Sequence, residues 1–219
     1  MKITKLSHSC LLVEMPEPVS RTVLFDPGMM SEPLVDVESL VYLDDIIITH
    51  GHPDHLSIPL VQKLLQKFPE VRITAPPSVV VELKQHDVFA TSEAYEGIQF
   101  FKSLHEQGDP LFETPEQIGV HYLGMLSHPG DSHSFTETCP ILALPVTAPW
   151  GAAVRAVNLT IELKPTYVLP IHDWHWSEAA REQMYGRLEQ ILTPQGIEFI
   201  PLKDGEPYVI KDVTPQAGI

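Results

Sequence analysis

The sequence has few cysteines and no long apolar run. Its two cysteines, Cys10 and Cys139, are too few for a disulfide framework, and neither belongs to a Cys-x-x-Cys pair. We expect both to be small buried side chains in a reducing compartment. No apolar stretch reaches the ~18 residues that a membrane-spanning helix needs, and the first residues alternate in polarity instead of forming a signal peptide. The sequence therefore predicts a cytoplasmic protein.

Basic residues are also scarce. The chain has 14 Lys and Arg against 29 Asp and Glu, which gives a formal net charge of −15. Proteins that bind DNA or RNA neutralise phosphates with basic surface, so this charge argues against a nucleic-acid partner. It disfavours an anionic membrane surface for the same reason. We therefore expect a small-molecule substrate, while the oligomeric state stays open.

Nothing in the sequence divides the chain into parts. It contains no internal repeat, low-complexity segment or Gly/Ser linker. A length of 219 residues suits one domain, which we predict to span residues 1–219. Hydrophobic residues make up 43% of the chain, enough for a core without crosslinks.

Hydrophobic patterns predict strands and helices in alternation. Short apolar or alternating runs predict strands at 3–6, 10–14, 22–25, 45–49, 71–74, 98–101, 120–126, 141–144, 167–171, 198–202 and 208–210. Apolar residues at helical spacing predict helices at 57–68, 77–85, 152–163 and 177–192. Ser57 and Ser177 are expected to cap the helices that they begin. Strands that come first in a cluster and then mix with helices predict an α/β fold with helices outside the sheets.

The most informative segment is 49–57, Thr-His-Gly-His-Pro-Asp-His-Leu-Ser. It lies after a predicted buried strand and before a predicted helix, where α/β proteins place their chemistry. His50 and His52 would point the same way from an extended loop, because side chains repeat every two residues. Asp54 and His55 would turn toward a neighbouring point. Two such groups of ligands would hold two divalent ions.

This His-x-His-x-Asp-His loop resembles the signature of the metallo-β-lactamase superfamily of binuclear metal hydrolases. Further matches follow in the family's order along nearly the whole chain. They are Asp26 in Phe-Asp-Pro-Gly, a third histidine at His105 or His128, Asp131 in Gly-Asp-Ser, and His172 in Pro-Ile-His. Within the superfamily, segments 6–9, 130–132 and 170–172 are most similar to the branch that contains ascorbate-6-phosphate lactonase.

The resemblance implies an αββα sandwich, in which two packed β-sheets carry helices on their outer faces. It also implies a ligand set for two ions. One ion would be bound by His50, His52 and the third histidine, and the other by Asp54, His55, His172 and a bridging Asp131. Imidazole and carboxylate ligands without a thiolate suit Zn²⁺, Mn²⁺ or Fe²⁺.

Two histidines compete for the place of the third ligand. The superfamily places this ligand on a loop after a strand and well before the bridging aspartate. His105 follows the predicted strand 98–101, whereas His128 shares the turn of Asp131. We therefore favour His105 and keep His128 as the alternative.

Residues around the ligands have expected roles of their own. Asp26 would orient His55 through its ring N–H. His8 is expected beside the site, as in the branch named above. The sequence leaves open whether three tryptophans line the pocket or pack in the core: Trp150, Trp174 and Trp176.

The resemblance implies a hydrolase in which two divalent ions supply a bridging hydroxide at neutral pH. Asp54 would be both a ligand and the catalytic residue that orients the hydroxide and carries its proton. We expect a lactone or another small ester as substrate, with a phosphodiester second and nucleic acid third. A di-iron redox protein and a metal-stabilised scaffold without catalysis are the alternatives. The lack of a flavin domain argues against the first, and the complete ligand set argues against the second.

Overall fold

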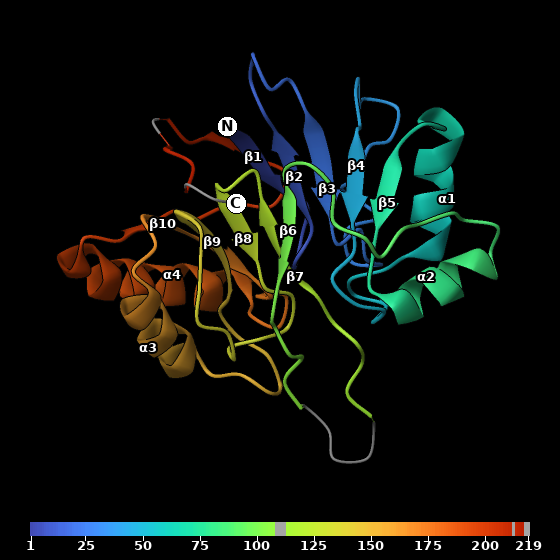
Figure 1. Cartoon of the computed structure of the whole chain (residues 1–219). Helices are drawn as coiled ribbons and strands as arrows, with labels where there is room; N and C mark the ends of the chain where they lie inside the picture. The colour runs from blue at the N-terminus through green and yellow to red at the C-terminus, as the bar shows by residue number, and fades with distance from the viewer. Residues whose placement is uncertain (108–112, 212, 217–219) are drawn as a thin grey trace. The chain divides into compact units, whose positions relative to one another are not determined.

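The computed structural model describes residues 1–107, 113–211 and 213–216, and within them the chain forms two units. Unit 1 comprises Met1–Ala94, Pro115–Gln117 and Leu202–Asp212, and unit 2 comprises Tyr95–Thr114, Ile118–Pro201 and Val213–Ile219. In the described residues, each unit contains one six-stranded mixed sheet and two α-helices (Figure 1). Both cysteines are buried and unbridged, as predicted.

The sheet of unit 1 has the strand order β12-β1-β2-β3-β4-β5. Its strands are β1 (Lys2–Lys5), β2 (Leu11–Glu14), β3 (Thr22–Phe25), β4 (Asp45–Ile47), β5 (Arg72–Thr74) and β12 (Pro207–Val209). The pairs from β3 to β5 are parallel and the others antiparallel. The two helices are α1 (Ile58–Lys67) and α2 (Pro77–Lys84).

Alternation along the strands explains how α1 and α2 pack in unit 1. Leu24 and Ile46 point to the same face of the sheet, because side chains alternate along a strand and these two residues are paired in register. That face carries the buried cluster that also contains Leu60 and Leu64 of α1. The two leucines are four residues apart and therefore lie on one side of the helix.

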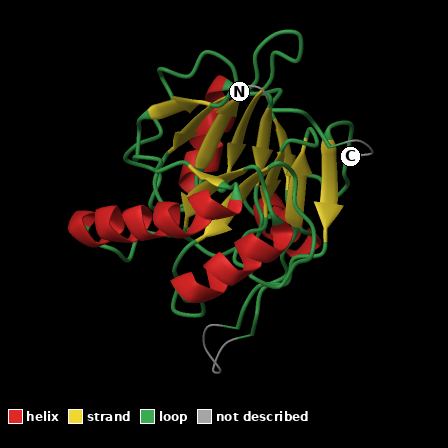
Figure 2. Ribbon diagram, turned by 90° about the vertical axis from the view of Figure 1, so that its left-hand side faces the viewer, coloured by secondary structure: helices red, strands yellow, loops and turns green. Residues whose placement is uncertain are grey.

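The sheet of unit 2 has the order β11-β10-β9-β8-β7-β6. Its strands are β6 (Ile98–Phe101), β7 (Gly119–Tyr122), β8 (Leu126–His128), β9 (Ile141–Pro145), β10 (Tyr167–Ile171) and β11 (Glu198–Phe199). The pairs from β8 to β11 are parallel. The α-helices α3 (Ala153–Leu163) and α4 (Glu178–Leu192), the latter followed by a short 3₁₀ turn (Thr193–Gln195), lie at the left of Figure 1 and face the viewer in Figure 2. No helix in the described ranges is long and apolar enough to cross a membrane.

One predicted strand is wrong. The run 120–126 was expected as a single strand, but a tight turn divides it into β7 and β8. Leu123 and Gly124 have φ angles of 53° and 61°, the left-handed conformation that two-residue hairpin turns need. Leucine rarely adopts positive φ, so the local sequence does not indicate this turn. Most other predicted elements occur with ends shifted by a few residues.

Strand direction brings particular loops together within each unit. In unit 1, β1, β3 and β4 run the same way, because β2 is antiparallel to both β1 and β3 and β4 is parallel to β3. In unit 2, β6, β8, β9 and β10 run the same way for similar reasons. The loops after these strands therefore meet at one edge of each sheet, which is where ligand sites form in α/β folds.

Candidate functional site

The predicted site residues of unit 1 follow three strands that end at the same edge. His8 follows β1, Asp26 follows β3, and the loop 49–56 follows β4. His8 and Asp26 have φ angles of 53° and 44°. The left-handed region is costly for residues other than glycine and recurs at functional sites, where surrounding contacts hold it in place.

Asp26 is the buried centre of a hydrogen-bond network in unit 1. Its Oδ1 accepts from the Thr49 amide at 2.7 Å, and its Oδ2 accepts from the Thr49 hydroxyl at 2.9 Å. Oδ2 also lies 2.7 Å from His55 Nδ1, which donates to it. A hydrogen on Nδ1 leaves the Nε2 lone pair of His55 for a metal, and this Nε2 lies 3.7 Å from Asp54 Oδ2. This is the contact expected of a residue that orients a ligand histidine.

The same network orients His50. The Thr49 hydroxyl donates to Asp26, so it can accept a hydrogen from His50 Nδ1, which lies 3.1 Å away. The rings of His50 and His52 are 4.8 Å apart between centroids. Each offers one ring nitrogen, and these two nitrogens lie within 4.8 Å of each other. The expectation that both histidines point to one place is met within unit 1.

Asp54 has a closer neighbour than the sequence indicated. His8 Nε2 lies 3.0 Å from Asp54 Oδ2, so the histidine predicted only to be nearby contacts the proposed catalytic carboxylate directly. Ligand atoms of His8, Asp54 and His55 lie within 4.8 Å of one another. The backbone around Asp54 packs closely on Gly28, where an added Cβ would lie 1.8 Å from the Asp54 carbonyl oxygen. Glycine at position 28 therefore allows the loop after β3 to support the loop after β4.

Unit 2 contains the remaining predicted ligands. His172 follows β10 with a φ angle of 61°, and its Nδ1 donates to the Thr147 carbonyl at 2.7 Å. Its Nε2 lies 3.0 Å from Asp131 Oδ2. His105 Nδ1 donates to the Glu106 carbonyl at 2.6 Å, and its Nε2 lies 3.6 Å from the same Asp131 oxygen. Two histidines therefore present Nε2 to one carboxylate.

The alternative third histidine has different neighbours. His128 is buried in β8, and its Nδ1 accepts a hydrogen bond from the Gly130 amide at 3.3 Å. Ligand atoms of His105 and Asp131 lie within 4.8 Å of each other in a candidate metal group that does not include His128. The geometry of unit 2 thus favours His105, in line with the sequence argument.

The three tryptophans of unit 2 have three different environments. Trp150 is half-buried, and its ring centroid lies 5.4 Å from that of His172 and 6.4 Å from that of His105. Trp176 packs against the core cluster beneath α3 and α4. Trp174 is 55% exposed. Of the three, Trp150 lies beside the predicted ligands, and Trp176 is partly buried against the edge of the core.

Sequence reasoning missed three residues around Asp131 and His105. His133 is buried, its Nε2 donates to the Pro145 carbonyl at 2.6 Å, and burial lowers its pKa below the ordinary value. Glu106 and Arg155 form an ion pair at 2.9 Å. Burial alone would raise the pKa of Glu106, but hydrogen bonds from Ser134 and the His133 amide and the charge of Arg155 hold it below its usual value. The one sequence feature that could have pointed to Glu106 is its position directly after the candidate ligand His105.

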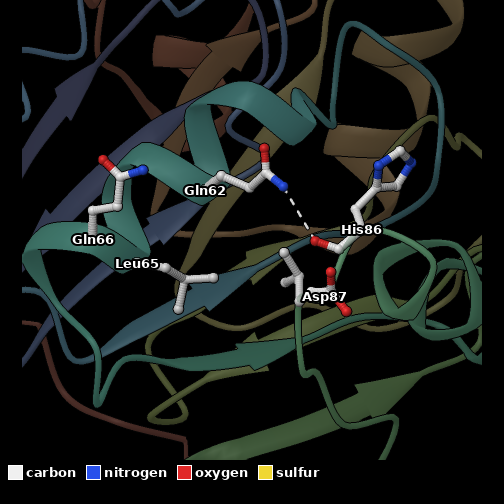
Figure 3. Close-up of a pocket in the computed structure, with 6 residues that line it drawn as sticks. Gln62, Leu65, Gln66, His86 and Asp87 are labelled. Carbon is white, nitrogen blue, oxygen red and sulfur yellow. Dashed lines mark hydrogen bonds between the residues drawn. The ribbon is translucent and has the colours of Figure 1, made fainter.

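A pocket elsewhere in unit 1 involves none of the predicted site residues. It has a volume of about 360 Å³ and is lined by Gln62, Leu65, Gln66, His86, Asp87 and Val88. Figure 3 shows the side chain of Gln62 reaching across from α1 to the His86 carbonyl, to which its Nε2 donates at 3.1 Å. His86 and Asp87 are the titratable residues of this lining, and neither belongs to the candidate metal groups found among the described residues.

The donor atoms suit divalent metal ions. Each unit contains imidazole and carboxylate groups, which are ligands that Zn²⁺, Mn²⁺ and Fe²⁺ accept. His50, His55, His105 and His172 all place Nδ1 beside a protein oxygen. Metal-binding histidines typically use one ring nitrogen in this way, which directs the other to the metal. The residues present therefore fit the metal that the sequence motif implies.

Comparison with known proteins identifies the family. The family model described as the beta-lactamase superfamily domain matches residues 2–172 of this chain. The chain belongs to this family. The matched span contains every ligand that was predicted for the β-lactamase superfamily motif, from His50 to His172.

Individual relatives agree with this assignment. Protein Rv0786c of Mycobacterium tuberculosis is 31% identical over 206 residues, covering 88% of this chain and 93% of the relative. A structure named as a metal-dependent hydrolase from Parabacteroides distasonis superposes with a TM-score of 0.69 at 20% identity, covering 92% of this chain and 93% of the other. Igni18, a metallo hydrolase from Ignicoccus hospitalis, gives a TM-score of 0.69 at 18% identity, with 96% and 99% covered.

The comparisons confirm the metallo-β-lactamase fold class that was predicted, with two mixed sheets and four α-helices in the described residues. The family model confirms the superfamily, and the two solved structures support the fold. That the protein is a metal-dependent hydrolase stays a prediction. The lactonase branch, the substrate and the number and identity of the ions stay predictions.

Proposed function

We propose that this protein is a hydrolase that uses two divalent metal ions to cleave a lactone or another small ester. The observation that carries the proposal is the shared orientation of the buried histidines. His55 and His172 donate from Nδ1 to a carboxylate or a carbonyl, and their Nε2 atoms lie 3.7 Å and 3.0 Å from Asp54 and Asp131. Such fixed tautomers are typical of metal ligands.

The proposed ligand set is the one that the family motif implies. One ion would be held by His50, His52 and His105 and the other by Asp54, His55 and His172, and Asp131 would be a further ligand. In this proposal residues 1–219 act as one metallo-hydrolase domain. When bound, two such ions would lower the pKa of a water and so supply hydroxide at neutral pH.

The chain's own residues have separate tasks in this reaction. Asp54 is the carboxylate that accepts and carries a proton, and its side chain is 26% exposed, so substrate can reach it. His8 holds Asp54 Oδ2 in place through a hydrogen bond of 3.0 Å. Trp150 lies against His172 and His105, where its ring can pack on the substrate.

The choice of a lactone rests on the resemblance of segments 6–9, 130–132 and 170–172 to the ascorbate-6-phosphate lactonase branch. The acidic net charge favours a small molecule over nucleic acid. Two unbridged buried cysteines suit a reducing cytoplasm.

Metal counting tests the first part of the proposal. We expect two equivalents of Zn²⁺, Mn²⁺ or Fe²⁺ per chain after reconstitution, because the ligand set is complete for two ions. Elemental analysis of the dialysed protein measures this directly. Less than half an equivalent of metal on folded protein would refute the proposal.

The Asp54→Ala variant tests the catalytic assignment. Removal of the carboxylate takes away a ligand and the proton carrier, so hydrolysis should fall by several orders of magnitude while the protein stays folded. The substrate comes from a screen of lactones, phosphodiesters and thioesters. Asp36→Ala, which removes an exposed carboxylate, is the control. Turnover by Asp54→Ala close to that of the control would show that the loop is not the catalytic centre.

A further inference from the structure

Glu106 in unit 2 is held far more tightly than a loop glutamate requires. It follows His105, and its side chain is only 13% exposed. Its Oε1 accepts hydrogen bonds from the Ser134 hydroxyl at 2.6 Å and the His133 amide at 3.1 Å. Arg155 donates hydrogen bonds to both oxygens, from Nη2 to Oε1 at 2.9 Å and from Nη1 to Oε2 at 3.1 Å. Four donors therefore fix one carboxylate.

These contacts join three segments that are distant in sequence. Glu106 lies on the loop after β6, Ser134 lies on the loop after β8, and Arg155 lies in the first turn of α3. The Glu106 amide also donates to the Asp131 carbonyl at 2.8 Å. Any movement of the loop after β6 relative to Asp131 would break several of these bonds together.

The backbone of Glu106 acts directly on a proposed metal ligand. Its carbonyl accepts from His105 Nδ1 at 2.6 Å, which fixes the ring with Nε2 at 3.6 Å from Asp131 Oδ2. The same residue thus orients His105 through its carbonyl and is tied to Asp131 through its amide. Its side chain keeps this arrangement anchored to α3.

A purely stabilising ion pair explains these observations less well. The Arg155 side chain is 47% exposed, although Glu106 is not, and solvent around the guanidinium weakens the contribution of the pair to folding stability. A bidentate arginine–carboxylate pair is notable instead for its fixed geometry, because the planar guanidinium matches both oxygens at once. Two metal ligands on separate loops need a fixed distance between them, and a rigid pair of this kind can maintain it.

We propose that Glu106, Ser134 and Arg155 form a positioning clamp that holds His105 and Asp131 at the spacing that a metal ion needs. The clamp itself binds no metal. It acts through the ligands, and the proposal rests on the metal-dependent function proposed above. Groups that support metal ligands in this way typically change metal affinity by about 10–100-fold when they are removed.

The test compares metal affinity with folding stability in clamp variants. Arg155→Met keeps an aliphatic side chain but removes the guanidinium group. Arg155→Lys keeps the positive charge but cannot donate to both Glu106 oxygens in the same way. We expect Arg155→Met to raise the Kd for Zn²⁺ by about 10–100-fold, with Arg155→Lys intermediate. Competition with a chromophoric chelator measures the Kd, and the visible spectrum of Co²⁺-loaded protein reports the geometry around the metal.

Matched variants separate the clamp from other effects. Arg187→Met removes an exposed arginine from α4 and should change neither the Kd nor the Co²⁺ spectrum. The thermal midpoint of metal-free Arg155→Met should stay close to that of the wild type, because the guanidinium is half exposed and Glu106 keeps its hydrogen bonds from Ser134 and the His133 amide. Ser134→Ala removes one bond to Glu106 and should weaken Zn²⁺ binding less than Arg155→Met does.

The outcomes distinguish this inference from the function on which it rests. If the wild type binds metal and Arg155→Met binds it with the same Kd and Co²⁺ spectrum, the clamp is refuted while the proposed function stands. A weaker Kd accompanied by an equal loss of metal-free stability would also refute it, because Arg155 would then be merely structural. A wild type that binds no metal would refute both proposals.

Discussion

Buried histidines in this protein differ in the groups that surround their ring nitrogens. His55 and His172 each have a hydrogen-bond acceptor at Nδ1 and a carboxylate near Nε2. His121 has instead the Ser127 hydroxyl at 2.8 Å from Nδ1 and the ring of Phe101 stacked at 4.3 Å. Burial lowers the pKa of His121 to about 4. His121 is therefore a core residue that stays neutral, although histidine is a common metal ligand elsewhere.

His121 should make folding stability depend on pH. The folded histidine takes up a proton only near pH 4, whereas the unfolded one does so near pH 6.5, so the unfolded state binds more protons between these values. The free energy of unfolding should therefore fall by about 1.4 kcal/mol per pH unit from this group as the pH drops through that window. Urea unfolding of metal-free protein should show a shallower dependence for His121→Gln. The exposed His86→Gln is the control, and equal slopes for His121→Gln and wild type would contradict the prediction.

At the scale of elements, α1 is joined to the loop that precedes it. Ser57 caps the helix by accepting from the Leu60 amide at 3.2 Å, and its hydroxyl donates to Glu32. Its own amide donates to the Pro27 carbonyl at 2.8 Å, next to the segment that carries Asp26. The start of α1 therefore limits where the ligand loop after β4 can end.

Replacing this cap should destabilise unit 1. We expect Ser57→Ala to lower the free energy of unfolding by about 1 kcal/mol or more. The substitution leaves the buried Leu60 amide without its hydrogen-bond acceptor and removes the bond to Glu32. Ser177→Ala removes the corresponding cap of α4, where the bond to Ala180 is exposed and 3.3 Å long, and should cost less. Urea unfolding of both variants measures the difference. A loss in Ser177→Ala equal to that in Ser57→Ala would show that the buried contacts of Ser57 add nothing.

At the scale of the whole molecule, strand direction determines where the predicted ligands lie, and net charge determines how the protein attracts ions. Strand direction gathers the predicted ligands at one edge of the sheet in each unit. The net charge of −15 would stay strongly negative even with two divalent ions bound. Attraction of an anionic substrate must therefore be local to the metal ligands instead of arising from the overall field.

The same charge predicts how the protein responds to nucleic acid. We expect the metal-loaded protein to show no measurable affinity for single- or double-stranded DNA or for RNA at low salt, because few basic groups are present to release counterions. Fluorescence anisotropy with labelled oligonucleotides measures this. Tight binding that weakens steeply as salt is added would contradict the prediction and favour a nuclease.

Much of the candidate site was readable from the sequence because its signals are local. The ligand spacing in residues 50–55 lies within one loop, and alternation or helical period marks the elements around it. Asp26 was identified as a partner of His55 from the family pattern, and the 2.7 Å contact between them agrees. The turn at Leu123 was missed because the pairing of β7 with β8 holds a conformation that leucine disfavours.

The sequence was enough to identify the superfamily and the fold class, and it pointed to the loop 49–57 as the candidate ligand loop. Only the tertiary structure placed His105 beside Asp131, packed Trp176 against the core, and joined Glu106 to Arg155. These contacts bring together residues that are tens of positions apart. Strand order and direction decide such pairings, and no local pattern of polarity or spacing records which distant loops will share an edge of a sheet.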